Sequence, residues 1–162
     1  MASANPKRMT WRERFETTRE PRVVGDPRGR GSMLISTPRE IDAVMRGVRK
    51  GKAVTVAQLM RKLADDHGTD ATCPPTTGIF LRVVAEVAEE DLEAGRTRLT
   101  PYWRVVKAGG SLNPKFPGGV ELQAARLKEG GHAIKRGSDG RPRQVVDYRR
   151  HRQEIWRAKG RG

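Results

Sequence analysis

The stretch Gly51-Lys52-Ala53-Val54-Thr55-Val56-Ala57-Gln58-Leu59 decides how the chain folds, because it predicts a turn that leads into a helix. Thr55 and Gln58 have the spacing of a capping box, in which two side chains satisfy backbone amides at a helix start. Apolar residues then recur at helical spacing, and Gly68 is suited to end the helix. The residues that form this apolar stripe are Leu59, Met60 and Leu63.

Two further helices are predicted beside this one. The sequence Thr37-Pro38-Arg39-Glu40 is a second capping box with proline at the first helical position, and it predicts a helix over about 38–48. Residues 73–77, Cys-Pro-Pro-Thr-Thr, are expected to form a stiff connector before a third helix from Gly78 to about Glu93. Its apolar residues are Ile79, Phe80, Val83, Val84 and Val87. Capped helices joined by short connectors indicate a helix-turn-helix-like arrangement.

The remainder of this region predicts little strand. Residues 101–107, Pro-Tyr-Trp-Arg-Val-Val-Lys, favour a short β-segment, and Ala108-Gly109-Gly110-Ser111 is a turn. Residues 114–119 form a loop, and a last helix is expected over 120–128 with Gly130 at its end. The predicted fold class is therefore mainly α with very short β-strands.

Charge divides the chain of 162 residues into three parts. Lys and Arg number 33 against 19 Asp and Glu, a formal net charge of +14. Residues 1–32 carry a net +4, residues 33–134 carry +3, and residues 135–162 carry +7. We expect 33–134 to be the folded domain and 1–32 to be a basic, largely disordered tail. Residues 135–162 are expected to be a flexible basic tail, with a helix over about 145–156 as one alternative.

Two aromatic residues in the first segment, Trp11 and Phe15, are spaced four residues apart, as on one face of a short helix. Two interpretations remain open for them. They either dock on the folded domain or contact a partner molecule.

Several classes of protein are excluded by composition. No run approaches 18 apolar residues, which argues against a transmembrane helix, and residues 1–9 lack the apolar stretch of a secretory signal. The single cysteine, Cys73, excludes an intramolecular disulfide and a cysteine-ligated zinc site. His67, His132 and His151 lack metal-ligand spacing, and no cofactor motif is present. We expect a monomeric, cytoplasmic, nucleoid-associated protein without metal or cofactor.

The excess of basic residues favours a polyanionic partner, and duplex DNA before an anionic membrane. Backbone amides near a helix start bind phosphate, which points to Thr76, Thr77 and Gly78. The basic C-terminal segment is expected to neutralise DNA phosphates, with a solvated tail as the alternative. The full set of expected DNA contacts adds Lys52, Thr55, Arg82, Lys107, Arg149, Arg150 and Arg152.

Two stretches resemble the C-terminal domain of the O6-alkylguanine-DNA alkyltransferases. Residues 51–59 resemble the family's G-K-V-T-T-Y-G-x-L, and residues 101–106, Pro-Tyr-Trp-Arg-Val-Val, resemble its active-site Pro-Cys-His-Arg-Val-Val. The pairs Gly109-Gly110, Gly118-Gly119 and Glu129-Gly130 follow in the family's order. The resemblance covers about residues 34–134. It implies a winged-helix-like helix-turn-helix domain that binds duplex DNA in the minor groove.

The chain departs from this family at the reactive residues. Tyr102 stands where the nucleophilic cysteine would be, and Trp103 where the activating histidine would be. A phenol without a neighbouring base is a poor nucleophile at neutral pH. The departure makes the chain similar to the alkyltransferase-like proteins, which bind alkylated guanine without repairing it and pass the lesion to other repair machinery. The resemblance thus implies a binding protein, not an enzyme.

The resemblance also implies site residues. Tyr102 and Trp103 would form an aromatic wall of a pocket for a flipped base, although both are alternatively core residues. Arg104 matches the arginine that holds the active-site loop, and Val56 stands where the family has a phosphate-contacting tyrosine. Arg82 aligns with the arginine that fills the gap left by the flipped base. Its alternative is a salt-bridged arginine beside Glu86, Glu89 and Glu90.

Two other functions remain open at this stage. One is a DNA-damage-processing enzyme, which would transfer an alkyl group to Cys73 or cleave the base or strand at a rebuilt site. The other is an architectural protein that binds any duplex equally.

Overall fold

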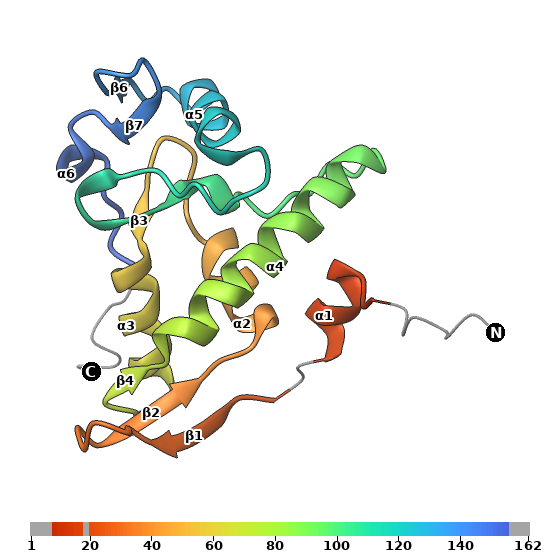
Figure 1. The fold of residues 1–162 in the computed structure, drawn as a ribbon, viewed down its shortest axis with the longest axis vertical. Helices are drawn as coiled ribbons and strands as arrows, with labels where there is room; N and C mark the ends of the chain where they lie inside the picture. Colours follow the sequence, from red (N-terminus) through yellow and green to blue (C-terminus); the bar gives the residue numbers. More distant parts are fainter. Residues whose placement is uncertain (1–7, 18–19, 156–162) are drawn as a thin grey trace, which may run out of the picture.

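The computed structural model describes residues 8–17 and 20–155. Figure 1 shows the long helix α4 running diagonally through the molecule, with a small sheet beside its start at the bottom of the view and a hairpin at the upper left, away from its other end. The helices are α1 (Trp11–Thr17), α2 (Pro38–Arg46), α3 (Val56–His67), α4 (Pro74–Glu93), α5 (Gly119–Glu129) and α6 (Tyr148–His151). The strands are β1 (Arg22–Gly25), β2 (Ser32–Ile35), β3 (Val54–Thr55), β4 (Ala71–Thr72), β5 (Val105–Val106), β6 (Ile134–Arg136) and β7 (Pro142–Val145).

Local sequence explains where α2 and α3 begin and end. The Thr37 side chain accepts a hydrogen bond from the Glu40 amide at 3.2 Å, and Pro38 occupies the first turn of α2. Both halves of the predicted capping box are present at α3, where Thr55 and Gln58 bond each other's backbone amides. Gly68 ends α3 in the left-handed conformation at φ 65°. These helices confirm the mainly α fold class.

Helix α4 begins four residues earlier than the sequence predicted. Cys73 is its N-cap and prolines 74 and 75 occupy its first turn. A proline at this position loses no hydrogen bond, because the first amides of a helix have no partner within it. Residues 74–77 therefore lie inside the helix and not in the predicted connector. Ile79 also departs from the expected buried stripe, because 60% of its surface is exposed.

The strands are short and, in the part of the chain that the structure describes, form three separate sheets. Strand β2 lies between β1, with which it is antiparallel, and β4, with which it is parallel. Strands β3 and β5 are parallel and pair Val54 with Val105. This pairing places the start of α3 beside the 101–106 segment. The arrangement is consistent with the predicted winged-helix-like, helix-turn-helix class with very short strands.

The N-terminal segment is more ordered than its composition predicted. Within residues 1–32, the described residues form α1 and β1, while residues 1–7 and 18–19 lie outside the described part. Phe15 packs against the core, and Arg12 forms an ion pair with Asp91 of α4. Strand β1 pairs along its length with β2. These tertiary contacts offset the ordering entropy, which composition alone does not reveal.

The C-terminal segment is also folded onto the domain as far as it is described. Strands β6 and β7 form an antiparallel hairpin, so Val145 belongs to a strand and not to the predicted helix over 145–156. Only Tyr148–His151 is helical, and Trp156 lies outside the described residues. The reason is burial, because Val145 and Tyr148 are 1% and 8% exposed in a cluster with α5. The Gln153 side chain then bonds backbone groups of Gly47 and Arg49.

Among the described residues, no helix has the length and apolar composition needed to cross a bilayer.

Candidate nucleic-acid interface

Tyr102 is a core residue. None of its surface is exposed, and its ring meets Trp103 and Phe116 edge to face, with centroids 5.3 and 5.1 Å apart. Its hydroxyl donates a hydrogen bond to Glu89 Oε1 at 2.6 Å. Arg126 holds both oxygens of the same carboxylate at 2.9 Å. The residue at the family's nucleophile position is therefore fixed inside the protein.

The chemistry of this phenol follows from its surroundings. Burial disfavours the phenolate, and the Glu89 carboxylate both accepts the phenol's proton in a hydrogen bond and repels a negative oxygen. Together they raise the pKa of Tyr102 well above its ordinary value of 10. A neutral, buried phenol cannot attack an alkyl group at neutral pH.

Trp103 and Arg104 keep this loop in place. The buried apolar residues form a main core, which includes Tyr102, and a second cluster, which includes Leu127 and Val145. Trp103 packs against both, and its backbone carbonyl accepts a hydrogen bond from Gln123 at 3.1 Å. Arg104 donates to the Val48 carbonyl at 2.7 Å, and burial lowers the pKa of its guanidinium. This contact fits the loop-holding role that the resemblance implied for Arg104. None of residues 102–104 is among the described residues that line a cavity between α1, α3 and α4.

A cavity of about 770 Å³, here called the basic cavity, lies between α1, α3, α4 and the loop of residues 107–116. Its apolar surface includes Trp11, Val56, Met60, Leu81 and Phe116. Its cationic residues are Arg14, Arg82, Lys107 and Lys115. Among the described residues that line it, none is acidic. This combination suits a ligand with an apolar body and negative charge.

Four of the residues predicted from the sequence meet at the basic cavity: Val56, Gly78, Arg82 and Lys107. They come from α3, from α4 and from the loop after β5. The loop carrying Lys107 is tight, because Gly110 has φ +90° and an added Cβ would lie 2.7 Å from Tyr148 Cβ. The cavity thus joins parts of the sequence that are 50 residues apart.

The predicted hydroxyl and thiol contacts have partners within the protein. Thr55 caps α3, and Thr77 donates to the Cys73 carbonyl at 2.7 Å and is buried. The Thr76 hydroxyl and the Cys73 thiol lie 3.1 Å apart. None of these residues, nor Lys52, is among the described residues lining the basic cavity. Their DNA-contacting roles, and the nucleophile role of Cys73, stay predictions.

Arg82 lines the basic cavity and is also weakly paired within the protein. Its guanidinium carbon lies 5.1 Å from the Trp11 ring centroid, and its Nε lies 3.7 Å from Glu86. The alternative that the sequence allowed, pairing with an acid one turn further on, is thus present in a weak form. Its guanidinium still lines the cavity, and its role in filling the base stack stays a prediction.

The C-terminal arginines form a separate surface. Arg149 and Arg150 line a smaller hollow with Tyr148 and Gly109, and Arg152 pairs with Glu154 at 2.8 Å. Among the described residues, none of the three lines the basic cavity. A DNA contact by these residues would therefore be a second one.

Sequence reasoning missed the lining residues Arg14, Lys115 and Phe116, and it left open whether Trp11 contacts a partner. The i,i+4 spacing of Trp11 and Phe15 was the available signal for α1, and docking on the domain is the interpretation that the structure supports. No local pattern marked Phe116, because its place depends on how the 107–116 loop folds back onto Tyr102.

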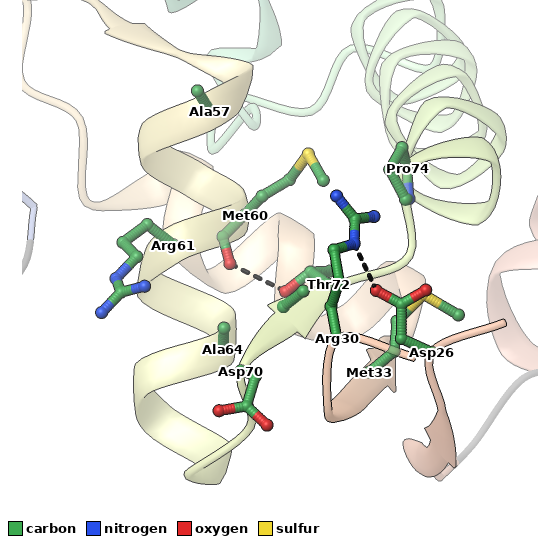
Figure 2. Close-up of a pocket in the computed structure, with 11 residues that line it drawn as sticks. Asp26, Arg30, Met33, Ala57, Met60, Arg61, Ala64, Asp70, Thr72 and Pro74 are labelled. Atoms are coloured by element: carbon green, nitrogen blue, oxygen red, sulfur yellow. Dashed lines mark hydrogen bonds and ion pairs between the residues drawn. The ribbon is translucent and has the colours of Figure 1, made fainter. Parts of the chain in front are cut away.

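A second cavity, of about 410 Å³, provides a contrast and shares Met60 and Pro74 with the first. Figure 2 shows it between α3, the start of α4 and the β1–β2 hairpin. Its two arginines, Arg30 and Arg61, are each paired with an aspartate, at 2.9 and 3.2 Å. Its charges are therefore satisfied internally, unlike those of the basic cavity. Among the described residues, no cluster of three potential ligands could hold a metal ion.

Comparison with known proteins adds a structural likeness. No family model and no curated protein matches the sequence. Two solved structures match, those of S. pombe Atl1 in complex with damaged DNA containing O6-carboxymethylguanine and of S. pombe ATL in complex with DNA. Each has a TM-score of 0.50 and 18% identity, and covers 74% of this chain and 94% of the other.

The chain has the fold of an alkyltransferase-like protein. This fold accounts for nearly the whole of the fission-yeast protein and leaves about a quarter of this chain without a counterpart there. The additional length is consistent with segments such as α1, which are outside the region of family resemblance at residues 34–134.

Proposed function

We propose that this protein binds duplex DNA without altering it and recognises alkylated bases of the O6-alkylguanine type for repair. The observation that carries the proposal is the basic cavity, in which four cationic side chains and no described acidic one surround apolar walls. DNA binding depends first on neutralising phosphates with Lys and Arg. The DNA-bound structures of S. pombe Atl1 support the same conclusion by likeness of fold.

Nucleotide flipping is the mode of recognition that the cavity supports best. Its volume of about 770 Å³ falls in the usual range for ligand sites, and its apolar residues can pack against a base. Ile79, which is 60% exposed at the cavity, is suited to enter the base stack as an apolar wedge. It is an alternative to Arg82 for filling the gap left by the base.

The burial of Tyr102 supports a binding role without chemistry at this residue. Its phenol is held by Glu89, and its raised pKa keeps it protonated. We further propose that the protein acts as a monomer on cytoplasmic DNA and passes the lesion to another repair protein.

The test is a paired titration at about 150 mM salt, with one duplex carrying a single O6-methylguanine and an otherwise identical unmodified duplex. A preference of tenfold or more, about 1.4 kcal/mol, supports lesion recognition. Equal affinity for both duplexes would leave an architectural DNA-binding protein, and no binding would overturn the proposal. Mass spectrometry of the protein after incubation shows whether Cys73 or another residue has gained an alkyl group, which would make it an enzyme.

A further inference from the structure

The helix α1 is attached to the domain by one set of side chains and presents another set to the basic cavity. Phe15 packs against the core beneath Arg39, whose guanidinium carbon lies 5.4 Å from the ring centroid. Arg12 pairs with Asp91 of α4. Trp11 and Arg14 both line the basic cavity, and Trp11 also contacts Arg82 of α4.

Trp11 holds two arginines from different elements. The guanidinium carbon of Arg14 lies 5.0 Å from the indole centroid, and that of Arg82 lies 5.1 Å from it. Both distances fall within the range of cation–π contacts. Because both are measured to one centroid, the two guanidinium groups lie no more than about 10 Å apart. Both cations are therefore held beside the same ring at the basic cavity, where a DNA backbone can contact them.

The charges of this pair are incompletely satisfied. Among the described residues, no carboxylate lies within ion-pair distance of Arg14, and Arg82 has only the 3.7 Å contact with Glu86. Two like charges beside one ring repel each other, and bound anionic groups would offset this repulsion. The cavity beside them offers further cations and, among its described lining residues, no acid.

We propose that Arg14 and Arg82, positioned by the indole of Trp11, form a phosphate-binding pair that contacts the DNA backbone at the basic cavity. The proposal rests on the proposed function and assigns a DNA-binding role to α1. The planar guanidinium fork matches the geometry of phosphate oxygens, and the ring reduces the freedom that each arginine loses on binding. Trp11 is a positioning residue in this arrangement.

The experiment compares Arg14→Ala with Arg98→Ala, which removes the same charge from an exposed segment after α4, away from the basic cavity. Affinity for duplex DNA is measured as a function of salt concentration. Arg14→Ala should lose about fivefold to tenfold in affinity, equally for modified and unmodified duplexes, because a phosphate contact carries no base identity. Its salt dependence should fall by about one phosphate contact. Arg98→Ala should match the wild type.

The role of Trp11 has its own readout. Trp11→Ala should reproduce the loss seen with Arg14→Ala, and Trp11→Phe should restore most of the affinity because a ring face remains. Identical affinities and salt slopes for Arg14→Ala and Arg98→Ala would overturn the inference while leaving the proposed function intact. A wild-type protein that binds neither duplex would overturn the proposed function and this inference together.

Discussion

Two consecutive segments, residues 101–106 and 107–116, differ sharply in what they contact. The first carries Tyr102, which is fully buried and held by Glu89 and Arg126. The second carries Lys107 and Lys115 to the basic cavity and ends at Phe116, whose ring touches Tyr102 on one side and the cavity on the other. The position aligned with the family's nucleophile is therefore one ring behind the basic cavity.

This difference shows that the segment resembling the family's active-site motif has a structural role in this chain. A tyrosine that fills the interior needs a partner for its hydroxyl, and Glu89 provides it. This partly buried carboxylate is in turn paired with Arg126 at 2.9 Å. The next segment is then free to form the ligand-facing wall, supported by Leu112, whose amide donates to the Arg143 carbonyl of β7 at 3.0 Å.

The largest effect on the difference between the two segments is expected from removing the buried ring of Tyr102. Tyr102→Ala should lower the free energy of unfolding by about 3–5 kcal/mol, because it leaves a cavity among Trp103, Phe116 and α4. Urea denaturation measures this loss. A change below about 1 kcal/mol would show that Tyr102 is not a core residue.

A milder substitution separates the hydroxyl from the ring. Tyr102→Phe should lower the free energy of unfolding by about 1.5–3 kcal/mol, because Glu89 loses one hydrogen bond but keeps Arg126. The affinity for duplex DNA should not change, since the ring behind Phe116 remains. A selective loss of lesion binding in this variant would instead place Tyr102 in the binding site.

The cavity side of the contrast is tested by charge. Lys107→Glu should reduce duplex affinity by about tenfold, or 1.4 kcal/mol, because it replaces a phosphate-facing cation by an acid. Lys128→Glu, an exposed residue of α5 outside the cavity lining, is the matched control. Equal losses in fluorescence-anisotropy titrations of the two variants would mean that net charge, and not the cavity, determines binding.

The smallest effect concerns acid sensitivity. His132 is 5% exposed, and neither ring nitrogen has a hydrogen-bond partner among the described residues. Burial, and then the nearby His151, lower the pKa of His132 below its ordinary value of 6.5. The stability it contributes is complete above pH 6.5 and is lost as the pH falls through the lowered pKa. Melting temperatures measured across pH 5–8 should show this loss of stability at acidic pH. In the His132→Asn variant the loss should be smaller.

The sequence predicted those parts of the fold that depend on neighbours in the chain. The capping boxes at Thr37 and Thr55 and the glycine that ends α3 are local signals, and the structure confirms them. The order in the N-terminal and C-terminal segments escaped prediction because it depends on packing against α4 and α5. Composition alone made both segments resemble tails.

The same division applies to the site. Val56, Gly78, Arg82 and Lys107 were found because they lie in or near recognisable motifs, and the cavity brings them together. Tyr102, predicted to form an aromatic wall with Trp103, is instead fully buried behind Phe116, whereas the role of the half-buried Trp103 stays a prediction. The alignment identifies Tyr102 as the residue at the nucleophile position. Only the packing of Phe116 shows that Tyr102 lies behind the lining of the basic cavity.

The pairing at the C-terminal end has a consequence for synthesis of the protein. Gln153 bonds the backbone of Ala53, accepts a hydrogen bond from Gln58 and contacts Gly47, so residues a hundred positions apart complete the surroundings of α3 together. On the ribosome, the start of α3 is made long before its partner emerges. The surroundings of α3 therefore stay incomplete until residue 153 has been synthesised. A stop codon before residue 153 would release a domain that lacks these contacts.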